Sequence, residues 1–300
     1  MKLNLSYILF IVSLLGCCLN ASAEELTVVY PEVKAPYDKI FKQITRGIQS
    51  EFKGKVHHLK LPRTFDAEQQ ANKITTNKII ALGKRGMRIA KLLYNDKSIV
   101  VGALPIKPNG ISGVSLMADP NLLFDSLHDL APNITTITVL YSPASEWIIA
   151  EAKIKAHKKG LILNSIAVDD IKAAVVAYNK IFEGSDLENT AIWLPLDPIT
   201  ANEKIIVPTI LEKAWENKMV IFSSKPTHAK RGALFSTLPD NELLGQQLAR
   251  LINTVNAKSR PSTVDTLEKI KLAVNLRTAA HLGFDYDTNE RSGFALTFPD

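Results

Sequence analysis

Cysteine is scarce in this 300-residue sequence: Cys17 and Cys18 are the two that it contains, and both fall within the first 23 residues. If those residues form a leader that is removed, the remaining chain has no thiol. Disulfide bonds, zinc thiolate sites and cysteine nucleophiles are then excluded. Glycine and proline, with 14 and 15 residues, are too infrequent for a collagen-like or low-complexity chain.

Aromatic residues are also sparse, at 7% of the chain, and they do not interleave with the basic clusters. A platform for single-stranded nucleic acid needs such interleaving, because bases stack on aromatic rings. The 36 Lys and Arg against 30 Asp and Glu leave a mildly basic net charge of +6. We therefore expect no nucleic-acid partner.

Signatures of catalysis and of metal binding are missing as well. Neither a G-x-S-x-G nucleophile elbow nor a paired-carboxylate motif occurs. No histidine stands at metal-ligand spacing from another ligand; the six are His57, His58, His128, His157, His228 and His281. A single histidine near serines, as at His228, does not make a triad. We predict no enzyme activity, no cofactor and no metal site.

What remains is the composition of a folded domain. Hydrophobic residues make up 46% and charged residues 22%, which excludes wholesale disorder. The length suits one large domain or two of ordinary size.

One long hydrophobic run opens the chain. Lys2 precedes an apolar stretch over 5–19, and Ala21-Ser22-Ala23 then forms an A-x-A cleavage site. The stretch is shorter than the roughly 20 residues that cross a bilayer. We expect residues 1–23 to be a signal peptide, and the mature protein to be periplasmic after cleavage near Ala23. Without Lys2, 35 basic residues face 30 acidic ones, a net +5.

A lipid anchor is the alternative fate of this leader. Leu14-Leu15-Gly16-Cys17 loosely resembles a lipobox, which would make a lipidated Cys17 the mature N-terminus. Leu15 fits that motif poorly, whereas the A-x-A site is good, so the free form is favoured and the anchored form stays open.

Apolar β-branched runs alternate with segments of helical period along the mature chain. The predicted strands span 26–30, 56–61, 78–82, 98–104, 134–141, 161–168, 191–194, 220–222 and 269–275. The predicted helices span 37–52, 65–76, 87–94, 120–130, 146–159, 171–182, 203–218 and 242–255. Such alternation is typical of α/β folds with parallel sheets covered by helices on both faces.

A Pro- and Gly-rich passage at 105–110 interrupts this rhythm like a crossover. We therefore predict two Rossmann-like, doubly wound lobes, an N-terminal one over 24–110 and a C-terminal one over 111–240. In such sheets ligands bind beyond the carboxyl ends of the strands, so a cleft between the lobes is the expected site.

Gly83-Lys84-Arg85-Gly86 is the most suggestive of the loops that follow a strand. It opens a helix, so backbone N–H groups, the helix dipole, Lys84 and Arg85 could together meet an anion. The P-loop spacing is absent. A solvated basic turn is the equally weighted alternative.

Polar residues also follow the strands of the second half. Ser142, Ser145 and Ser224 could offer hydroxyls to a ligand, although serines cap helices at least as often. Asp197 stands between two prolines, where it could face a cation or the N-terminus of the next helix. Lys225 follows Ser224 and adds a cation to the predicted cleft.

A series of short motifs gives the second half a family resemblance. In order along the chain they are Ile111-Ser112-Gly113-Val114-Ser115, Leu130-Ala131-Pro132, Val139-Leu140-Tyr141-Ser142-Pro143, Trp193-Leu194-Pro195-Leu196-Asp197, Lys230-Arg231-Gly232-Ala233 and Leu272-Ala273-Val274-Asn275-Leu276-Arg277-Thr278-Ala279-Ala280-His281-Leu282-Gly283. Together they resemble the substrate-binding proteins of ABC transporters, of the tryptophan/tyrosine-binding type.

The resemblance implies a type I periplasmic-binding-protein fold, whose two lobes are joined by three crossovers and close on a small solute. It implies a return helix at 241–258 in the N-terminal lobe, with 262–300 in the C-terminal lobe. It also implies delivery of the solute to an ABC permease in the inner membrane. We expect the protein to act as a monomer.

Departures from the family pattern fall in the predicted cleft. Lys84 and Arg85 stand where relatives have a Thr-Pro-like turn, and Ala103-Leu104-Pro105 lacks the acid that relatives carry after the fourth strand. Lys225 lies in a loop that is commonly acidic, whereas Asp197 keeps the family's acid. Cations in place of carboxylates favour a ligand carboxylate or phosphate over an α-amino group.

Three hypotheses for function follow, in descending order. The first is a periplasmic solute-binding component of an importer, which captures an amino-acid-like or anionic small molecule. The second keeps the fold but makes the protein a module that presents its ligand state to a membrane sensor. The third is an interaction protein with a degenerate cleft, which binds no small molecule.

Overall fold

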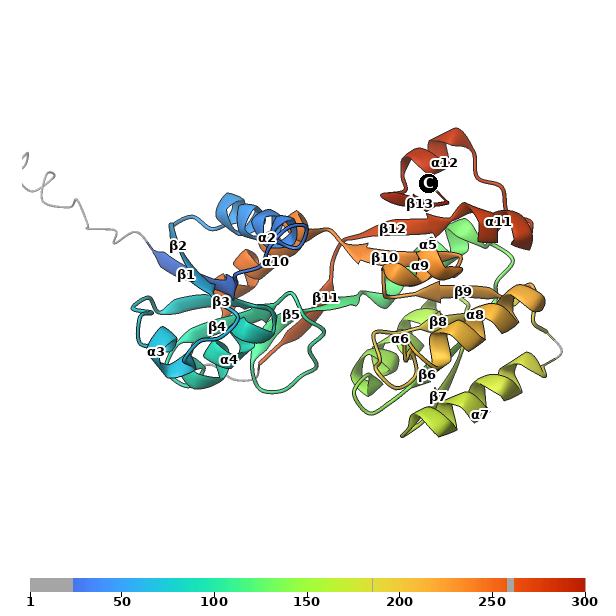
Figure 1. Cartoon of the computed structure of the whole chain (residues 1–300), viewed down its shortest axis with the longest axis horizontal. Coiled ribbons are helices and arrows are strands. Elements are labelled where there is room, and N and C mark those ends of the chain that lie inside the picture. Colours follow the sequence, from blue (N-terminus) through green and yellow to red (C-terminus); the bar gives the residue numbers. More distant parts are fainter. Residues whose placement is uncertain (1–23, 185, 258–261, 300) are drawn as a thin grey trace, which may run out of the picture.

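The computed structural model describes residues 24–184, 186–257 and 262–299, and it divides them into two lobes, each built around one sheet (Figure 1). The predicted signal peptide and its cleavage site lie outside the described residues. No helix within the described residues has the length and apolarity to cross a membrane.

The first lobe holds a six-stranded sheet in the order β11-β5-β4-β3-β1-β2, in which every neighbouring pair is parallel. Its elements are β1 (Glu25–Pro31), α2 (Asp38–Glu51), β2 (Lys55–Leu61), α3 (Ala67–Ala71), β3 (Lys78–Leu82), α4 (Gly83–Leu93), β4 (Ser98–Gly102), β5 (Ser112–Ala118), α10 (Asn241–Thr254) and β11 (Val264–Leu267).

The second lobe holds a seven-stranded sheet in the order β13-β12-β10-β9-β8-β6-β7, which is parallel except that β10 and β12 are antiparallel. Its elements are α5 (Pro120–Leu130), β6 (Thr136–Tyr141), α6 (Glu146–Lys158), β7 (Ile162–Ala167), α7 (Ile171–Phe182), β8 (Thr190–Leu194), α8 (Ile206–Glu216), β9 (Val220–Ser223), α9 (Thr227–Arg231), β10 (Phe235–Pro239), β12 (Ile270–Asn275), α11 (Leu276–Leu282), α12 (Thr288–Ser292) and β13 (Leu296–Phe298).

Each sheet is covered by helices on both faces, which explains the nearly continuous apolar strands. In β1, Leu26 and Val28 pack beneath α2 and α10, whereas Val29 packs on the opposite face with residues of α3 and α4. The second sheet repeats this arrangement, with α5 and α6 on one face and α7 and α8 on the other. The alternation in the sequence thus correctly predicted an α/β fold with two doubly wound sheets.

The chain changes lobe later than the sequence predicted. The passage at 105–110 is a loop of the first lobe, because Ile106 is buried in the core and its N–H donates to Ser115 Oγ at 3.1 Å. Strand β5 pairs with β4, so the first crossing follows Ala118 instead of residue 110. The two further crossings follow Pro239 and Leu267.

Strand β11 is a second correction to the predicted lobes. The region 262–300 was expected in the second lobe, but Val264 and Asp265 pair with β5 in the first sheet. Strands β5, β10, β11 and β13 were not predicted. Strands β10, β11 and β13 have five residues or fewer, and β5 contains two serines and a glycine. Their pairing therefore depends on neighbours distant in sequence.

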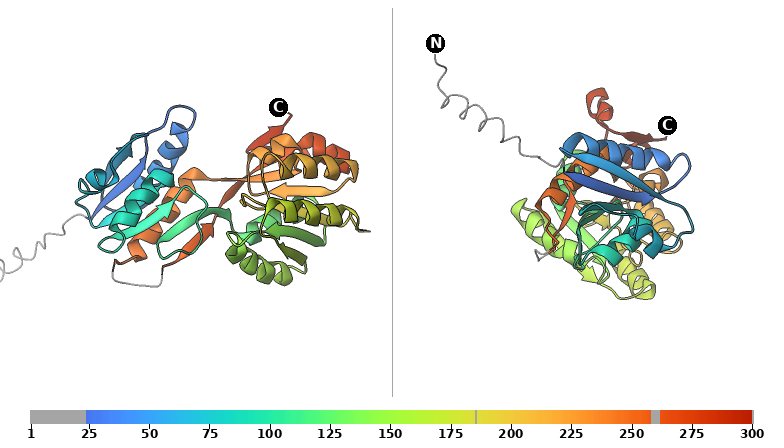
Figure 2. Two further views of the ribbon diagram at one scale, coloured as in Figure 1. Left: turned by 60° about the horizontal axis from the view of Figure 1, so that its bottom comes forward. Right: turned by 90° about the vertical axis from the view of Figure 1, so that its left-hand side faces the viewer.

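Helices α2 and α10 pack unusually closely on one face of the first sheet. A Cβ built on Gly245 would lie 2.1 Å from Ile44 O, and one on Gly47 would lie 1.9 Å from Glu242 O. Both distances are far inside van der Waals contact. The two glycines therefore allow the helix that returns from the second lobe to reach the core of the first (Figures 1 and 2).

We predict that Gly245→Ala lowers the free energy of unfolding by about 2 kcal/mol, because the new methyl group must push two backbones apart. Urea denaturation followed by circular dichroism measures the change. Gly293→Ala is the matched control, since its Cβ would have Glu290 O as nearest neighbour at 3.3 Å, and it should shift stability by less than about 1 kcal/mol. Equal effects of the two substitutions would contradict the packing argument.

Candidate functional site

The carboxyl ends of the parallel strands in each lobe point toward the other lobe. Strand β5 leaves the first sheet by its carboxyl end to enter α5, and β10 leaves the second sheet by its carboxyl end to enter α10. Because the other strands of each parallel set run in the same direction, the loops after them lie at these same two edges. Figure 2 shows from a second side that extended segments join the lobes there.

The first-lobe side of the site is built around the start of α4. This helix begins at Gly83, directly after β3, whereas the sequence placed its start at residue 87. Gly83 has a φ of 68°, a value that glycine adopts without strain and that turns the strand sharply into the helix. Lys84 is exposed in the first turn and has no hydrogen bond or ion pair with the described residues. The predicted cation is therefore present at a helix N-terminus.

Arg85 has a different role from its neighbour. Its Nη1 donates to Glu32 O at 2.9 Å and to Leu61 O at 2.8 Å. The guanidinium thus ties together the chain segments that follow β1 and β2. No carboxylate neutralises it among the described residues, so its positive charge still contributes to the potential at this edge of the sheet.

A pocket of about 250 Å³ lies beside this helix start, at the carboxyl end of β1. A Cβ on Gly83 would lie 3.7 Å from Pro31 and 3.8 Å from the Phe41 ring, two residues that line the pocket. Tyr30 and Phe41 form part of its wall, stacked with their ring centroids 6.2 Å apart. The backbone at the start of α4 therefore lies next to the pocket, although Lys84 itself is not one of the residues that line it.

Asp38 lines the same pocket at the first turn of α2. Its Oδ2 accepts a hydrogen bond from Lys42 Nζ at 2.8 Å, whereas its Oδ1 is buried with no partner among the described residues. The bond from Lys42 lowers the pKa of Asp38. The sequence did not indicate Asp38, Tyr30 or Phe41, because only residues directly after a strand were predicted to line the site.

On the second lobe, Asp197 gathers the loops that follow β6 and β8. Its Oδ2 accepts from the Ser142 N–H at 2.9 Å, the Ser142 hydroxyl at 2.7 Å and the Ser145 hydroxyl at 2.8 Å. Its Oδ1 accepts from the N–H groups of Ile199 and Thr200 at 2.9 and 3.0 Å. The structure brings the three predicted residues together, but the carboxylate is already surrounded by donors.

Five donors set the charge state of this carboxylate. Burial alone would raise the pKa of Asp197, but the hydrogen bonds from Ser142, Thr200 and Ser145 outweigh it and lower the pKa. Asp197 is only 3% exposed, so it acts as a structural hub, and a ligand ammonium group could reach it only by displacing these donors.

Ser224 also supports the wall of the second lobe. Its Oγ accepts from Trp193 Nε1 at 3.0 Å, and Trp193 is buried against Phe124 and Phe222. Ser224 itself is 6% exposed. Its hydroxyl oxygen therefore anchors the indole, while the hydroxyl proton has no assigned acceptor among the described residues.

Lys225 is not the free cation that the sequence suggested. Its Nζ lies 2.5 Å from Glu203 Oε1, and the same carboxylate contacts His228 Nε2 at 2.8 Å and Arg231 Nη1 at 2.6 Å. Glu203 was missed because it was assigned to the start of a helix over 203–218, whereas α8 begins at Ile206. The acid therefore lies in the preceding loop, where it can meet α9.

The Glu203 cluster continues into the core through a hydrogen-bonded chain. His228 Nδ1 lies 2.7 Å from Ser223 Oγ, and both side chains are fully buried. Burial lowers the pKa of His228, which opposes the raising effect of Glu203. Burial raises the pKa of Glu203, but hydrogen bonds from Lys225 and His228 lower it overall. Ser223 and His228 are thus enclosed within the fold, whereas Glu203 is 39% exposed.

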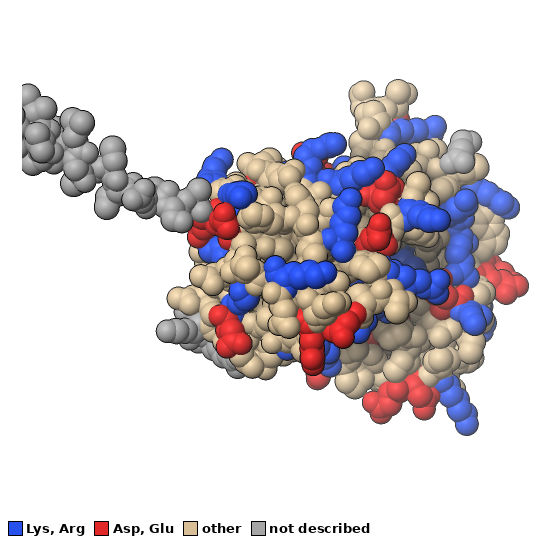
Figure 3. Space-filling view, turned by 60° about the vertical axis from the view of Figure 1, so that its left-hand side comes forward, with Lys and Arg blue, Asp and Glu red and all other residues tan. Residues whose placement is uncertain are grey.

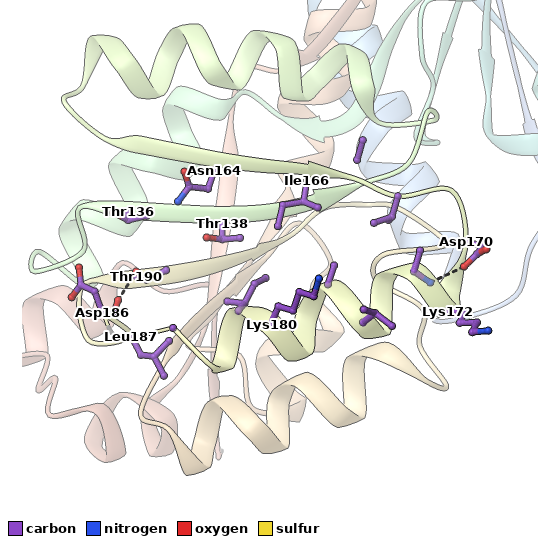
Figure 4. Close-up of a pocket in the computed structure, with 17 residues that line it drawn as sticks. Thr136, Thr138, Asn164, Ile166, Asp170, Lys172, Lys180, Asp186, Leu187 and Thr190 are labelled. Atoms are coloured by element: carbon purple, nitrogen blue, oxygen red, sulfur yellow. Dashed lines mark hydrogen bonds between the residues drawn. The ribbon is translucent and has the colours of Figure 1, made fainter.

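Another cavity, of about 1040 Å³, lies between α7 and the sheet face of β6 and β7 (Figure 4). It extends from Thr136 and Thr190, near the starts of their strands, to Val168 and Asp170, just beyond the carboxyl end of β7. No group of three or more His, Cys, Asp or Glu within the described ranges could hold a metal ion. On the face of the molecule shown in Figure 3, basic and acidic side chains are interspersed.

We predict that Asp197→Asn lowers the free energy of unfolding at pH 7 by about 3 kcal/mol, because buried donors lose a charged acceptor. The native pKa of Asp197 lies below its unfolded value, so this stability is complete above pH of about 4 and is lost as pH falls through the native pKa. Urea denaturation at pH 7 and in the acid range measures both effects.

The exposed Asp169 provides the control for this substitution. Asp169→Asn should leave the stability within about 0.5 kcal/mol of the unmodified protein at either pH. If Asp197→Asn kept the full acid dependence of the unmodified protein, the hub would not be the source of that dependence.

Comparisons with known proteins agree with this architecture. The ABC domain in complex with L-Trp from Streptococcus pneumonia superposes with a TM-score of 0.56 at 20% identity, covering 92% of this chain and 100% of that one. A ligand-free, open substrate-binding protein with adhesive properties from Clostridium difficile gives 0.62 at 17% identity, covering 91% and 99%. Both likenesses show a shared fold, that of the type I periplasmic binding proteins.

A comparison with models of protein families identifies the family as well as the fold. No curated protein matches the chain. The family model for ABC transporter substrate binding protein matches residues 105–291, more than half of the chain. That span includes the Asp197 hub, the Glu203 cluster and the crossings between the lobes. The chain therefore belongs to the ABC transporter substrate-binding protein family.

Proposed function

We propose that this protein is the solute-binding component of an ABC-type importer, and that it holds a small amino-acid-like carboxylate between its two lobes. The proposal rests on family membership and on one structural observation: an unpaired lysine at a helix N-terminus adjoins a pocket with an unpaired carboxylate oxygen. Those two groups have opposite charges and lie on the same lobe.

The anionic end of the solute is assigned to the start of α4. Lys84 supplies a full positive charge, and the first turn of the helix supplies N–H groups and the positive end of its dipole. Lys225 is held in an ion pair by Glu203, so its ammonium group is less available to the solute than that of Lys84. An anion therefore binds to the first lobe before the second lobe closes over it.

The cationic end of an amino acid is assigned to Asp38. Its Oδ1 is buried without a donor, and an ammonium group would satisfy it once the first turn of α2 shifts to open this atom to the pocket. Asp197 is less suited to bind the ammonium group, because its oxygens already accept five hydrogen bonds that the ammonium would have to displace. Tyr30 and Phe41 offer an aromatic wall to the side chain of the solute. The L-Trp complex of the pneumococcal relative supports this ligand class.

Export and delivery complete the proposal. The leader at 1–23 is removed near Ala23, and the mature protein delivers its solute to a permease in the inner membrane. Mass spectrometry of the protein from a periplasmic extract tests the leader. A mature chain that begins at Glu24 would agree with the proposal. A chain that begins at a lipid-modified Cys17 would contradict cleavage near Ala23 and show that the protein is anchored to a membrane.

We predict that thermal unfolding of the mature chain against amino acids and small carboxylates finds a ligand. A solute at 100 times its Kd stabilises the native state by about 2.7 kcal/mol, which shifts the midpoint measurably. Lys84→Ala should weaken binding by about 10-fold or more, because a charge-assisted hydrogen bond is lost. Lys91→Ala, at the far end of the same helix, is the control and should bind normally.

The substitution Asp38→Asn distinguishes the binding of the solute's amino group from the binding of its carboxylate. It should weaken the binding of an amino acid but spare a carboxylate that lacks the amino group. A ligand whose affinity is unchanged in both Lys84→Ala and Asp38→Asn would contradict the assigned site. Uptake of the ligand by cells with and without the gene tests the importer; a change in gene expression without uptake would favour the sensor hypothesis instead.

A further inference from the structure

The groove between α7 and the second sheet has a volume of about 1040 Å³, which is large enough for a small organic molecule. All the residues that line it belong to the second lobe, whereas the pocket proposed for the solute lies in the first. The two hollows share no residue. A molecule in the groove therefore occupies a site of its own.

Polar side chains line the floor of this groove, where a sheet face beneath a helix is normally apolar. In β6, Leu140 packs in the core under α7 and α8, and Thr138 lies two residues earlier on the same face. Thr138 is only 5% exposed, and its hydroxyl faces the groove with no hydrogen bond to the described residues. A buried hydroxyl without a partner is unusual, because the loss of its water costs free energy.

A second polar side chain lies beside Thr138 on the neighbouring strand. Asn164 of β7 pairs in register with Thr138 of β6, and adjacent strands lie about 5 Å apart. The Asn164 amide likewise has no hydrogen bond within the part of the chain that the structure describes. The groove floor therefore presents a hydroxyl and an amide side by side (Figure 4).

The opposite wall of the groove is one face of α7. Ala173, Val176, Ala177 and Lys180 recur at intervals of three and four residues, so they share that face. The two alanines leave space above the sheet. Lys180 is exposed, and its ammonium group forms no ion pair with the described residues. A cation on the helix thus faces the polar groups on the strands.

The acidic residues of the groove lie near its two ends. Asp170 and Lys172 line the end beyond β7, and Asp186 lines the other end. Asp170 already accepts a hydrogen bond from a backbone N–H at 2.7 Å, and Asp186 accepts one from a side-chain amide at 2.9 Å. No further acid lines the groove among the described residues, so the charge of Lys180 between the two ends is not neutralised.

We propose that this groove binds a small organic carboxylate with an apolar body. The carboxylate accepts hydrogen bonds from Thr138 and Asn164 and pairs with the ammonium group of Lys180. The apolar body lies against Ile166, two residues beyond Asn164, and against Val176, one turn before Lys180. Both apolar residues lie on the same side of the polar groups, toward the carboxyl end of β7, so one elongated molecule contacts them all.

The three polar groups select the charge of the ligand. A cation is repelled by Lys180, and an uncharged apolar molecule leaves the hydroxyl, the amide and the ammonium group without an acceptor. A carboxylate has two acceptor oxygens and satisfies all three donors. The site goes beyond the proposed solute capture and does not depend on it, because the solute is assigned to the first lobe.

Isothermal titration calorimetry of the mature chain with octanoate tests the site. The Lys84→Ala variant serves as the background for every titration, so that the anion site at α4 does not contribute. Octanoate should saturate the protein below about 2 mM. Acetate, which lacks the apolar body, and 1-octanol, which lacks the charge, should each bind at least about 10-fold more weakly.

Two lysine substitutions then locate the carboxylate. Lys180→Met should weaken octanoate binding by about 10-fold or more, because a charge-assisted hydrogen bond is lost. Lys158→Met removes a cation from α6, which covers the other face of the same sheet, and should leave the affinity unchanged.

Thr138→Val distinguishes a ligand-binding hydroxyl from a structural one. The substitution removes a hydroxyl that has no partner in the protein, so octanoate should bind about 5-fold more weakly while the thermal midpoint without ligand does not fall. Ala177→Trp fills the groove and should abolish binding in a chain that circular dichroism shows to be folded. Absence of saturable binding up to 2 mM octanoate would overturn the proposal. Equal affinities for octanoate and 1-octanol would also overturn it, as would equal weakening by Lys180→Met and Lys158→Met.

Discussion

Strand direction is the constraint on which the rest of this structure depends. The first sheet is wholly parallel, and the second is parallel from β10 to β7, so their carboxyl ends collect at two edges. The chain crosses between the lobes at those edges, which places the loops after β1, β3, β6, β8 and β9 on the sides that face each other. The close contact at Gly47 and Gly245 maintains this arrangement, because it seats a helix from the C-terminal half in the first lobe.

Within that frame, the two lobes contribute unequal chemistry. In the second lobe these charged groups have partners within the lobe itself. Asp197 accepts five hydrogen bonds, and Glu203 contacts Lys225, His228 and Arg231. The Asp197 cluster holds its loops in one conformation, since breaking one of its bonds leaves a buried polar group without its partner. In the Glu203 cluster only His228 is fully buried. The first lobe keeps Lys84 and one oxygen of Asp38 without partners. The first lobe therefore offers an unpaired lysine and one unpaired carboxylate oxygen, the two groups on which the proposed solute site rests.

The two surfaces of the second lobe also differ in what they leave open. Its edge toward the first lobe is polar and internally paired, whereas β7, the last strand of the sheet, exposes Ile162 and pairs with no described strand on its outer side.

The sequence by itself determined the α/β class, the two doubly wound sheets and the position of Lys84 at a helix start, because apolar periodicity and the residues flanking a strand are local properties. It also predicted that Ser142, Ser145 and Asp197 lie at one edge. Only the tertiary structure decided which charges remain free, since Glu203 meets Lys225 across 22 residues of chain. It likewise decided that β5 and β11 belong to the first sheet. Pairing between distant segments leaves no periodic trace in the sequence, and for that reason the lobe boundary and the charge balance of the site had to be found in the fold.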